Sequence, residues 1–175
     1  MEAAWQTEEV DKTRVMSGRG ASAHHQLTKQ YLDTLPVEAR VQAVLARGDA
    51  HVLTWAKLRR ICPHAPEPAL LAAVVNCAVL VQGCWVASSA LRCGGDPAAE
   101  AARDAALLLL AKRRTVPAAA VAAAAGARLP LWRELLRPLA VHHQSKGEYQ
   151  FKEPTDADFI KAHPNLVASQ VRGSR

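Results

Sequence analysis

Along the chain, the spacing of apolar residues changes from helical periods to short apolar runs. The first helix is predicted from Pro36 onward by apolar residues at helical spacing, namely Val37, Val41, Val44 and Leu45. Two more helices are predicted over residues 55–62 and 69–78, with Thr54 as the N-cap of the former. Residues 79–88 are then typical of two short strands joined by a tight turn at Gly83. Three helices followed by a two-stranded wing indicate a winged-helix unit.

A second, weaker copy of this pattern follows residues 93–97, where turn residues precede a helix opened by proline. Helices are predicted over residues 97–112, 118–125 and 129–139, and the second of them is expected to start from residues 115–117. A second hairpin is predicted over residues 141–144 and 148–152, with its turn at 145–147. Trp85 and Tyr149 each lie two residues after a turn glycine. This match favours two units in tandem.

The predicted fold class is therefore mainly α with small β wings, arranged as tandem winged-helix domains. Residues 1–26 are polar and are expected to form a mostly disordered leader. The two winged-helix domains are assigned to residues 27–93 and 96–154. Residues 155–175 are expected to form a C-terminal helical tail, which Phe159 and Ile160 would anchor.

The composition excludes few classes of function. The chain has 175 residues, and 22 Lys and Arg against 16 Asp and Glu give a formal net charge of +6. A basic balance favours contact with nucleic acid or with an acidic protein surface, without choosing between them. No signal peptide is evident, and the longest apolar run, residues 69–81, is too short to span a bilayer. A reducing cytosolic or nuclear compartment is the default expectation.

Catalytic and metal-binding chemistry is not indicated. The sequence lacks a phosphate-binding loop, a dinucleotide fingerprint, a nucleophile elbow and a zinc-protease motif. None of the four cysteines belongs to a Cys-x-x-Cys pair. His142 and His143 lie on a predicted strand, so they face opposite sides and are poorly placed to share one metal. We therefore expect no enzyme activity, no cofactor and no metal site.

The two units differ in their suitability for DNA. The third helix of the first unit, residues 69–78, carries no positive charge and is better suited to burial against protein. The second unit carries basic residues that could meet a phosphate backbone without sequence specificity, namely Arg128, Arg133, Arg137, Lys146 and Lys152. A solvated face is an equally simple explanation for these charges. Trp132 is expected to be a core residue.

Two motifs resemble a known family. The first combines residues 27–41 with the hairpin stretch 78–86, including Leu80, Val81, Gln82, Gly83 and Trp85. The second is the box at residues 158–165, including Phe159, Ile160, Lys161, His163 and Pro164. Together, and in this order, they resemble the middle of the Sin-like subunit of DNA-directed RNA polymerase III, the fifth subunit of the polymerase III specific series.

This resemblance implies a non-catalytic polymerase subunit in the nucleus. Proteins of that family pair with a second subunit in a module similar to general factor IIF, which helps in promoter opening, termination and reinitiation. Their winged helices are chiefly protein-docking elements. The family's pairing domain is a β-barrel that precedes the winged helices, and residues 1–26 are too few to form it, so the chain is expected to be a fragment or a short form.

The leading hypothesis is thus a protein-docking part of RNA polymerase III, with the polymerase subunits and especially the factor-IIF-like partner as its contacts. Non-specific DNA contact by the second unit is a possible addition, and no membrane contact is expected. The alternative hypothesis is a free winged-helix regulator that binds DNA through the basic second unit.

Overall fold

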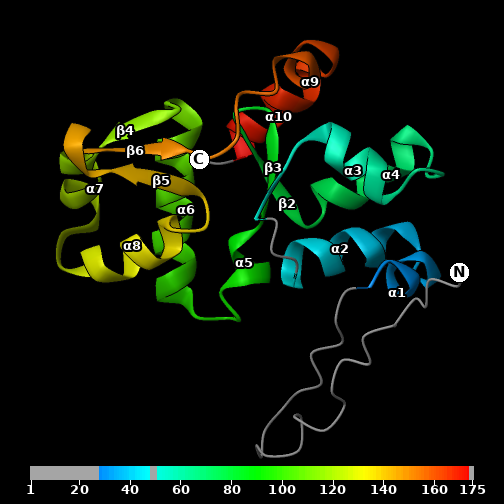
Figure 1. Cartoon of the computed structure of the whole chain (residues 1–175), viewed down its shortest axis with the longest axis horizontal. Helices are drawn as coiled ribbons and strands as arrows, with labels where there is room; N and C mark the ends of the chain where they lie inside the picture. The colour runs from blue at the N-terminus through cyan, green and yellow to red at the C-terminus, as the bar shows by residue number, and fades with distance from the viewer. Residues whose placement is uncertain (1–27, 48–50, 174–175) are drawn as a thin grey trace, which may run out of the picture.

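The computed structural model describes residues 28–47 and 51–173, so the expected leader lies outside the described residues. The described chain is mostly helical and contains two small antiparallel sheets. Figure 1 shows two halves side by side, each built around one sheet, with the last two helices returning to the first half. The expected fold class, mainly α with small β elements, is therefore confirmed.

The helices of the first half begin where the sequence supplies caps. Thr28 and Thr54 accept hydrogen bonds from the backbone N–H groups of Tyr31 and Lys57, so they cap α1 and α3 as Ser and Thr commonly do. The elements before the first hairpin are α1 (Lys29–Thr34), α2 (Val37–Arg47), β1 (Val52–Leu53), α3 (Trp55–Ile61) and α4 (Glu67–Val75). The bounds of α2 and α3 lie close to the predicted ones, whereas α4 ends at Val75, so the helix predicted over residues 69–78 was too long at its C-terminal end, where Ala78 already belongs to the first hairpin.

The first hairpin consists of β2 (Ala78–Val81) and β3 (Cys84–Ala87). Its two-residue turn places Gln82 at φ 54° and Gly83 at φ 79°, and positive φ at both positions matches the twist of the flanking strands. β1 pairs with the other side of β3, which gives the sheet order β1-β3-β2. β3 is therefore the central strand, and all four of its residues are buried.

The second half begins after α5 (Ser89–Arg92) with α6 (Pro97–Lys112), which is capped by Asp96. It continues with β4 (Thr115–Pro117), α7 (Ala118–Ala125), the short 3₁₀ helix η1 (Gly126–Arg128), α8 (Leu129–Leu136), β5 (Ala140–His143), η2 (Gln144–Lys146) and β6 (Glu148–Phe151). The sheet order is β4-β6-β5. Both halves thus repeat one order of elements: helix, strand, helix, helix, strand, strand.

Two local predictions for this half were wrong. Residues 115–117 do not start a helix but form β4, an edge strand paired with β6, where Pro117 at the strand end needs no N–H for the ladder. The third helix ends at Leu136 and not at 139, because Pro138 lacks the N–H that would continue it and Ala140 already pairs with Phe151 in the sheet.

The first sheet lies between two hydrophobic cores. Leu53, Trp85 and Ala87 face the helices of the first half, whereas Val52 and Val86 belong to the core of the second half. This division follows from the alternation of side chains along a strand. At the same boundary the buried Arg103 of α6 donates hydrogen bonds to the Ala87 carbonyl (2.7 Å) and to the Ser89 hydroxyl (3.2 Å). The first hairpin is therefore an interior layer of the molecule.

The chain ends with α9 (Ala157–Ala162) and α10 (Pro164–Gly173). Both helices, coloured orange to red in Figure 1, lie against the first half. Phe159 is only 2% exposed and belongs to the core of the first half, so the expected anchoring of this segment is observed. We refer to residues 154–173 as the C-terminal segment.

Candidate interaction site

The two sequence motifs, far apart along the chain, meet at the tip of the first hairpin. A Cβ atom at Gly83 would lie 2.5 Å from the Asp156 carbonyl oxygen and 3.0 Å from Cγ1 of Ile160. Real side chains do not come so close to backbone, so only glycine allows this approach, and its positive φ also favours glycine. The C-terminal segment therefore covers the hairpin tip.

Gln82 fixes the same tip on two sides. Its side-chain amide donates to the carbonyl oxygens of Leu110 (3.1 Å) and Ala111 (2.9 Å) at the end of α6. On the other side, the Asp156 N–H donates to the Gln82 carbonyl (3.0 Å), and the Thr155 hydroxyl donates to its side-chain oxygen (3.3 Å). A hairpin tip that is held in this way does not project into solvent.

Asp156 joins the C-terminal segment to α3. One carboxylate oxygen accepts from the Phe159 N–H (3.1 Å) and caps α9, and the other accepts from the Trp55 N–H (3.3 Å) at the start of α3. Nearby, the Cys84 thiol lies 3.4 Å from the Pro154 carbonyl, and Lys57 forms an ion pair with Glu153. These contacts place the first turn of α9 beside the first turn of α3.

An aromatic cluster surrounds Phe159. Its ring lies 5.7 Å from Trp85 in an edge-to-face arrangement, 5.4 Å from Trp55 and 4.6 Å from the His163 ring, measured between centroids. Such geometries add stabilisation to the area that aromatic side chains bury. His163 also has Nε2 3.5 Å from a Glu67 carboxylate oxygen at the start of α4. Trp85, fully buried, is the packing residue of this cluster.

An open groove of about 350 Å³ lies beside this cluster. Its lining residues are Trp55, Ala56, Glu67, Asp156, Asp158, Phe159, Ala162 and His163. Three of them are carboxylates, and none is Lys or Arg. We call this feature the acidic aromatic groove. The groove combines charged and aromatic groups on one open surface.

The other residues of the two motifs differ in their exposure to solvent. Leu80 is half-buried, Val81 is buried in the sheet, and Ile160 contacts the hairpin turn. Lys161 is exposed, and Pro164 begins α10 at an exposed position. The two motifs thus form one contact between the first hairpin and the C-terminal segment.

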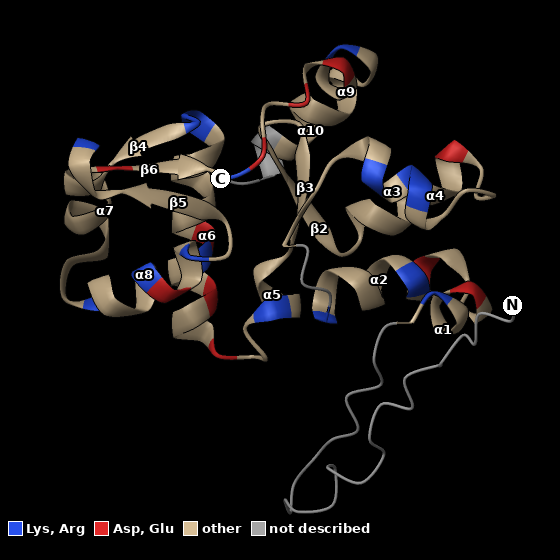
Figure 2. Ribbon diagram, viewed as in Figure 1, with Lys and Arg blue, Asp and Glu red and all other residues tan. Residues whose placement is uncertain are grey.

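The five basic residues of the second half are all exposed but do not converge. Arg133 and Arg137 lie four residues apart at α8, and Arg128 precedes that helix. Lys146 lies in η2 at the hairpin turn, and Lys152 follows β6. In Figure 2 the blue segments of α8 lie at the bottom of the second half, whereas blue segments beside β4 lie at its top. The structure therefore brings together only the α8 residues.

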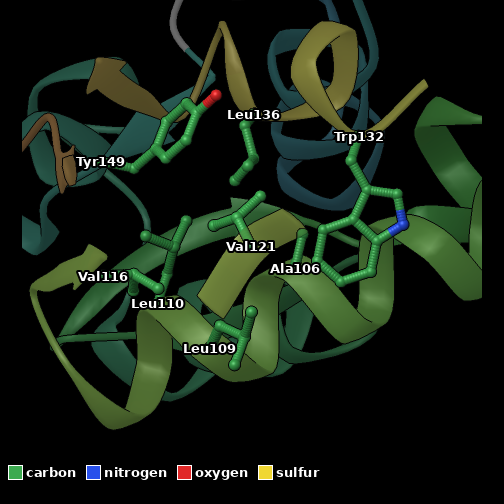
Figure 3. Close-up of a pocket in the computed structure, with 8 residues that line it drawn as sticks. All are labelled: Ala106, Leu109, Leu110, Val116, Val121, Trp132, Leu136 and Tyr149. Carbon is green, nitrogen blue, oxygen red and sulfur yellow. The ribbon is translucent and has the colours of Figure 1, made fainter. Parts of the chain in front are cut away.

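The interior of the second half is packed. Figure 3 shows apolar side chains from α6, β4, α7 and α8 directed toward one another, with Tyr149 from β6 and Trp132 at the edges. The space between them does not admit a water molecule. Trp132 is 3% exposed, which confirms it as a core residue. This region is a core and not a ligand site.

Within the described residues, 28–47 and 51–173, no three or more His, Cys, Asp or Glu side chains lie close enough together to hold a metal ion. His142 is exposed and stacks on Tyr149 at 4.3 Å, whereas His143 shares a 2.9 Å hydrogen bond with Gln150. Within the same described ranges, no helix is both long and apolar enough to cross a membrane.

The cysteines supply a test of the packing. Burial raises the pKa of Cys84 to about 11, and the neighbouring Asp156 carboxylate acts in the same direction. At pH 8 about one such thiol in a thousand would be the reactive thiolate. We expect iodoacetamide at pH 8 to label the partly exposed Cys93 well before Cys84, as measured by peptide mass spectrometry. Equal labelling of the two thiols in the folded chain would show that the C-terminal segment does not cover the hairpin.

Sequence reasoning did not find Trp55, Glu67 and Asp156 as members of the site. The local signals were present, because Thr54 was a candidate N-cap and Asp156 lies three residues before the apolar pair Phe159-Ile160. Nothing in the sequence pattern says that the start of α3 meets the start of α9 or that the start of α4 meets the end of α9.

The comparison with known families finds a match. The family model described as RPC5 protein matches residues 6–173. No curated protein matches the chain.

Proposed function

Because this chain belongs to the RPC5 family of RNA polymerase III subunits, we propose that it is a protein-docking part of that polymerase's transcription apparatus. The family is one of non-catalytic subunits. We propose further that the chain acts in the nucleus, within a module similar to general factor IIF, and that its contacts are other polymerase III subunits, including the partner subunit of that module. The observation that carries the proposal is the family match over nearly the whole chain.

The proposed architecture is a tandem pair of winged-helix units. Support comes from the repeated order of helix, strand, helix, helix, strand, strand, and from the repeated sheet orders β1-β3-β2 and β4-β6-β5. In this interpretation α4 and α8 are the corresponding third helices, and the two hairpins are the corresponding wings.

Docking to protein is favoured over DNA reading by the first unit. Its third helix, α4, carries no Lys or Arg, and DNA contact relies on such side chains. Its hairpin tip contacts α6 and the C-terminal segment through Gln82 and Gly83. The surfaces with which a winged helix commonly meets DNA thus carry no positive charge or are covered in this unit.

The decisive experiment is co-purification. We expect the tagged chain, expressed in cells of its source, to recover polymerase III subunits at moderate salt, identified by mass spectrometry. Recovery of polymerase I or II subunits in place of polymerase III, or of none, would contradict the proposal.

A double variant separates this proposal from the DNA-binding alternative. Arg133→Ala with Arg137→Ala removes the exposed α8 charges, and surface changes of this kind alter stability by about 0.5 kcal/mol or less. We expect the double variant to recover polymerase III subunits as the unaltered chain does. Loss of recovery together with loss of salt-sensitive DNA binding would favour a basic contact surface on α8.

A further inference from the structure

We propose that the acidic aromatic groove binds an arginine side chain presented by an exposed segment of a partner protein. This inference rests on the proposed docking function and names the chemistry of one contact. The groove is open, is about 350 Å³ in volume and is lined by residues from the starts of α3 and α4 and from both ends of α9. Its size suits one long side chain with its flanking backbone, and not a folded domain.

Charge is the first argument. The chain has a net charge of +6, yet Glu67, Asp156 and Asp158 line this groove and no lining residue is Lys or Arg. Helix N-termini favour acidic residues, which accounts for the positions of the three carboxylates. Each terminus offsets only about half a unit of charge, so three carboxylates leave the groove net negative. A cationic group is therefore the complementary ligand.

The availability of the carboxylates is the second argument. Both oxygens of Asp156 accept backbone hydrogen bonds, so this residue contributes charge and not a free acceptor. Asp158 is exposed, and the side chain of Glu67 is half exposed while its oxygen lies 3.5 Å from His163. Glu67 and Asp158 are thus the acceptors that a ligand can reach.

The aromatic wall selects arginine over other cations. Trp55 is partly exposed in the groove, and its ring packs on Phe159 and His163. A planar guanidinium can stack on an indole and also donate two parallel hydrogen bonds to a carboxylate, whereas an ammonium cannot do both.

Two cationic side chains near the groove do not fill it. Lys57 of α3 forms its ion pair with Glu153 on the segment that precedes α9. Lys161 lies on α9 and is exposed, and it does not line the groove.

The test uses the full 175-residue chain and a blocked pentapeptide with two arginines, with the same peptide carrying two lysines or two glutamates as comparisons. NMR signals of the Trp55 indole and the His163 ring are expected to shift with the arginine peptide, less with the lysine peptide and not with the glutamate peptide. Shifts confined to other residues, or equal shifts with all three peptides, would overturn the proposal.

The variant Glu67→Gln with Asp158→Asn removes both reachable charges while leaving the Asp156 cap in place. We expect it to lower affinity for the arginine peptide about fivefold or more at low salt. The matched control is Glu134→Gln, an exposed carboxylate on α8, which should leave the affinity unchanged. Thermal unfolding of both variants shows whether the fold is retained, and equal peptide affinity in the two variants would refute the assignment.

The experiments distinguish failure of the groove proposal from failure of the docking proposal. If the chain recovers polymerase III subunits but does not bind the arginine peptide, the groove assignment is wrong and the docking function stands. If it binds the peptide through Trp55 but recovers no polymerase III subunit, the docking function is wrong and the groove stands as an arginine site.

Discussion

Replacing Gly83 with alanine is expected to destabilise the chain by about 3 kcal/mol and to detach the C-terminal segment from the first hairpin. Two costs add at this position. A residue with a Cβ is strained at φ 79°, and the added Cβ would lie 2.5 Å from the Asp156 carbonyl oxygen. Because the obstructing atom belongs to the backbone, the segment must move and cannot simply change a rotamer. Urea unfolding followed by tryptophan fluorescence measures the loss.

Gly147→Ala is the matched control for this change. Gly147 has a similar φ of 62°, but a Cβ there would meet no atom within 4 Å. It should therefore cost only the conformational strain, about 1 kcal/mol. If the two substitutions destabilise the chain equally, the close approach of Asp156 to the hairpin turn does not contribute, and the described contact between the two motifs would be refuted.

Phe159→Ala is expected to remove about 3–5 kcal/mol of packing energy and to expose Trp85 to solvent. Phe159 is 2% exposed and contacts Trp55, Trp85 and His163. Since it is the buried aromatic residue of α9, its truncation should release α9 and α10 before the remainder unfolds. Hydrogen exchange should show lost protection at residues 155–170, and tryptophan emission should shift to longer wavelength.

Phe151→Ala provides an equal truncation in the other core. Phe151 is fully buried in β6 and belongs to the core of the second half. Its loss should lower global stability by a similar amount while the protection of residues 155–170 remains until global unfolding. Release of the C-terminal segment by both variants alike would mean that Phe159 is not its specific anchor.

Local chemistry explains why much of the fold could be predicted from the sequence. Thr54 accepts the hydrogen bond expected of an N-cap, and Asp96 caps the helix that Pro97 opens. The hairpin turn at Gly83 and the helix over residues 118–125 are indicated by neighbouring residues, and both are observed. Each of these features is decided within a few residues of the chain.

The errors concern features that distant residues decide. β4 has three residues and exists because β6 pairs with it, so its own sequence, which ends in Pro117, resembles a helix start. The covering of the hairpin tip depends on the approach of Asp156 to Gly83, and no periodicity encodes that approach. The same holds for the groove, whose Trp55, Glu67 and Asp158 come from three separate helices.

For the basic residues, the sequence predicts exposure but not their grouping in space. Exposure of Arg133, Arg137 and Lys146 could be inferred from their type, and all three are exposed. Whether such charges share one face depends on how α8 and the second hairpin are oriented, which the sequence does not reveal. The α8 arginines and the hairpin lysine remain separate in the structure, so the DNA-binding alternative gains no assembled surface.

The placement of the first sheet has a consequence for the order of events during synthesis. The ribosome completes β1, β2 and β3 before α6 and long before the C-terminal segment, yet Val52 and Val86 belong to the core that α6 helps to form. Until α6 is made, the nascent hairpin exposes the apolar face that carries Val52 and Val86, and until translation reaches Phe159 the cluster around Trp85 on the other face is incomplete. Exposed apolar surface on an incompletely folded chain promotes aggregation. Ribosomes paused between α5 and α9 should therefore carry chains that recruit chaperones, and resumed elongation through Pro164 should release them.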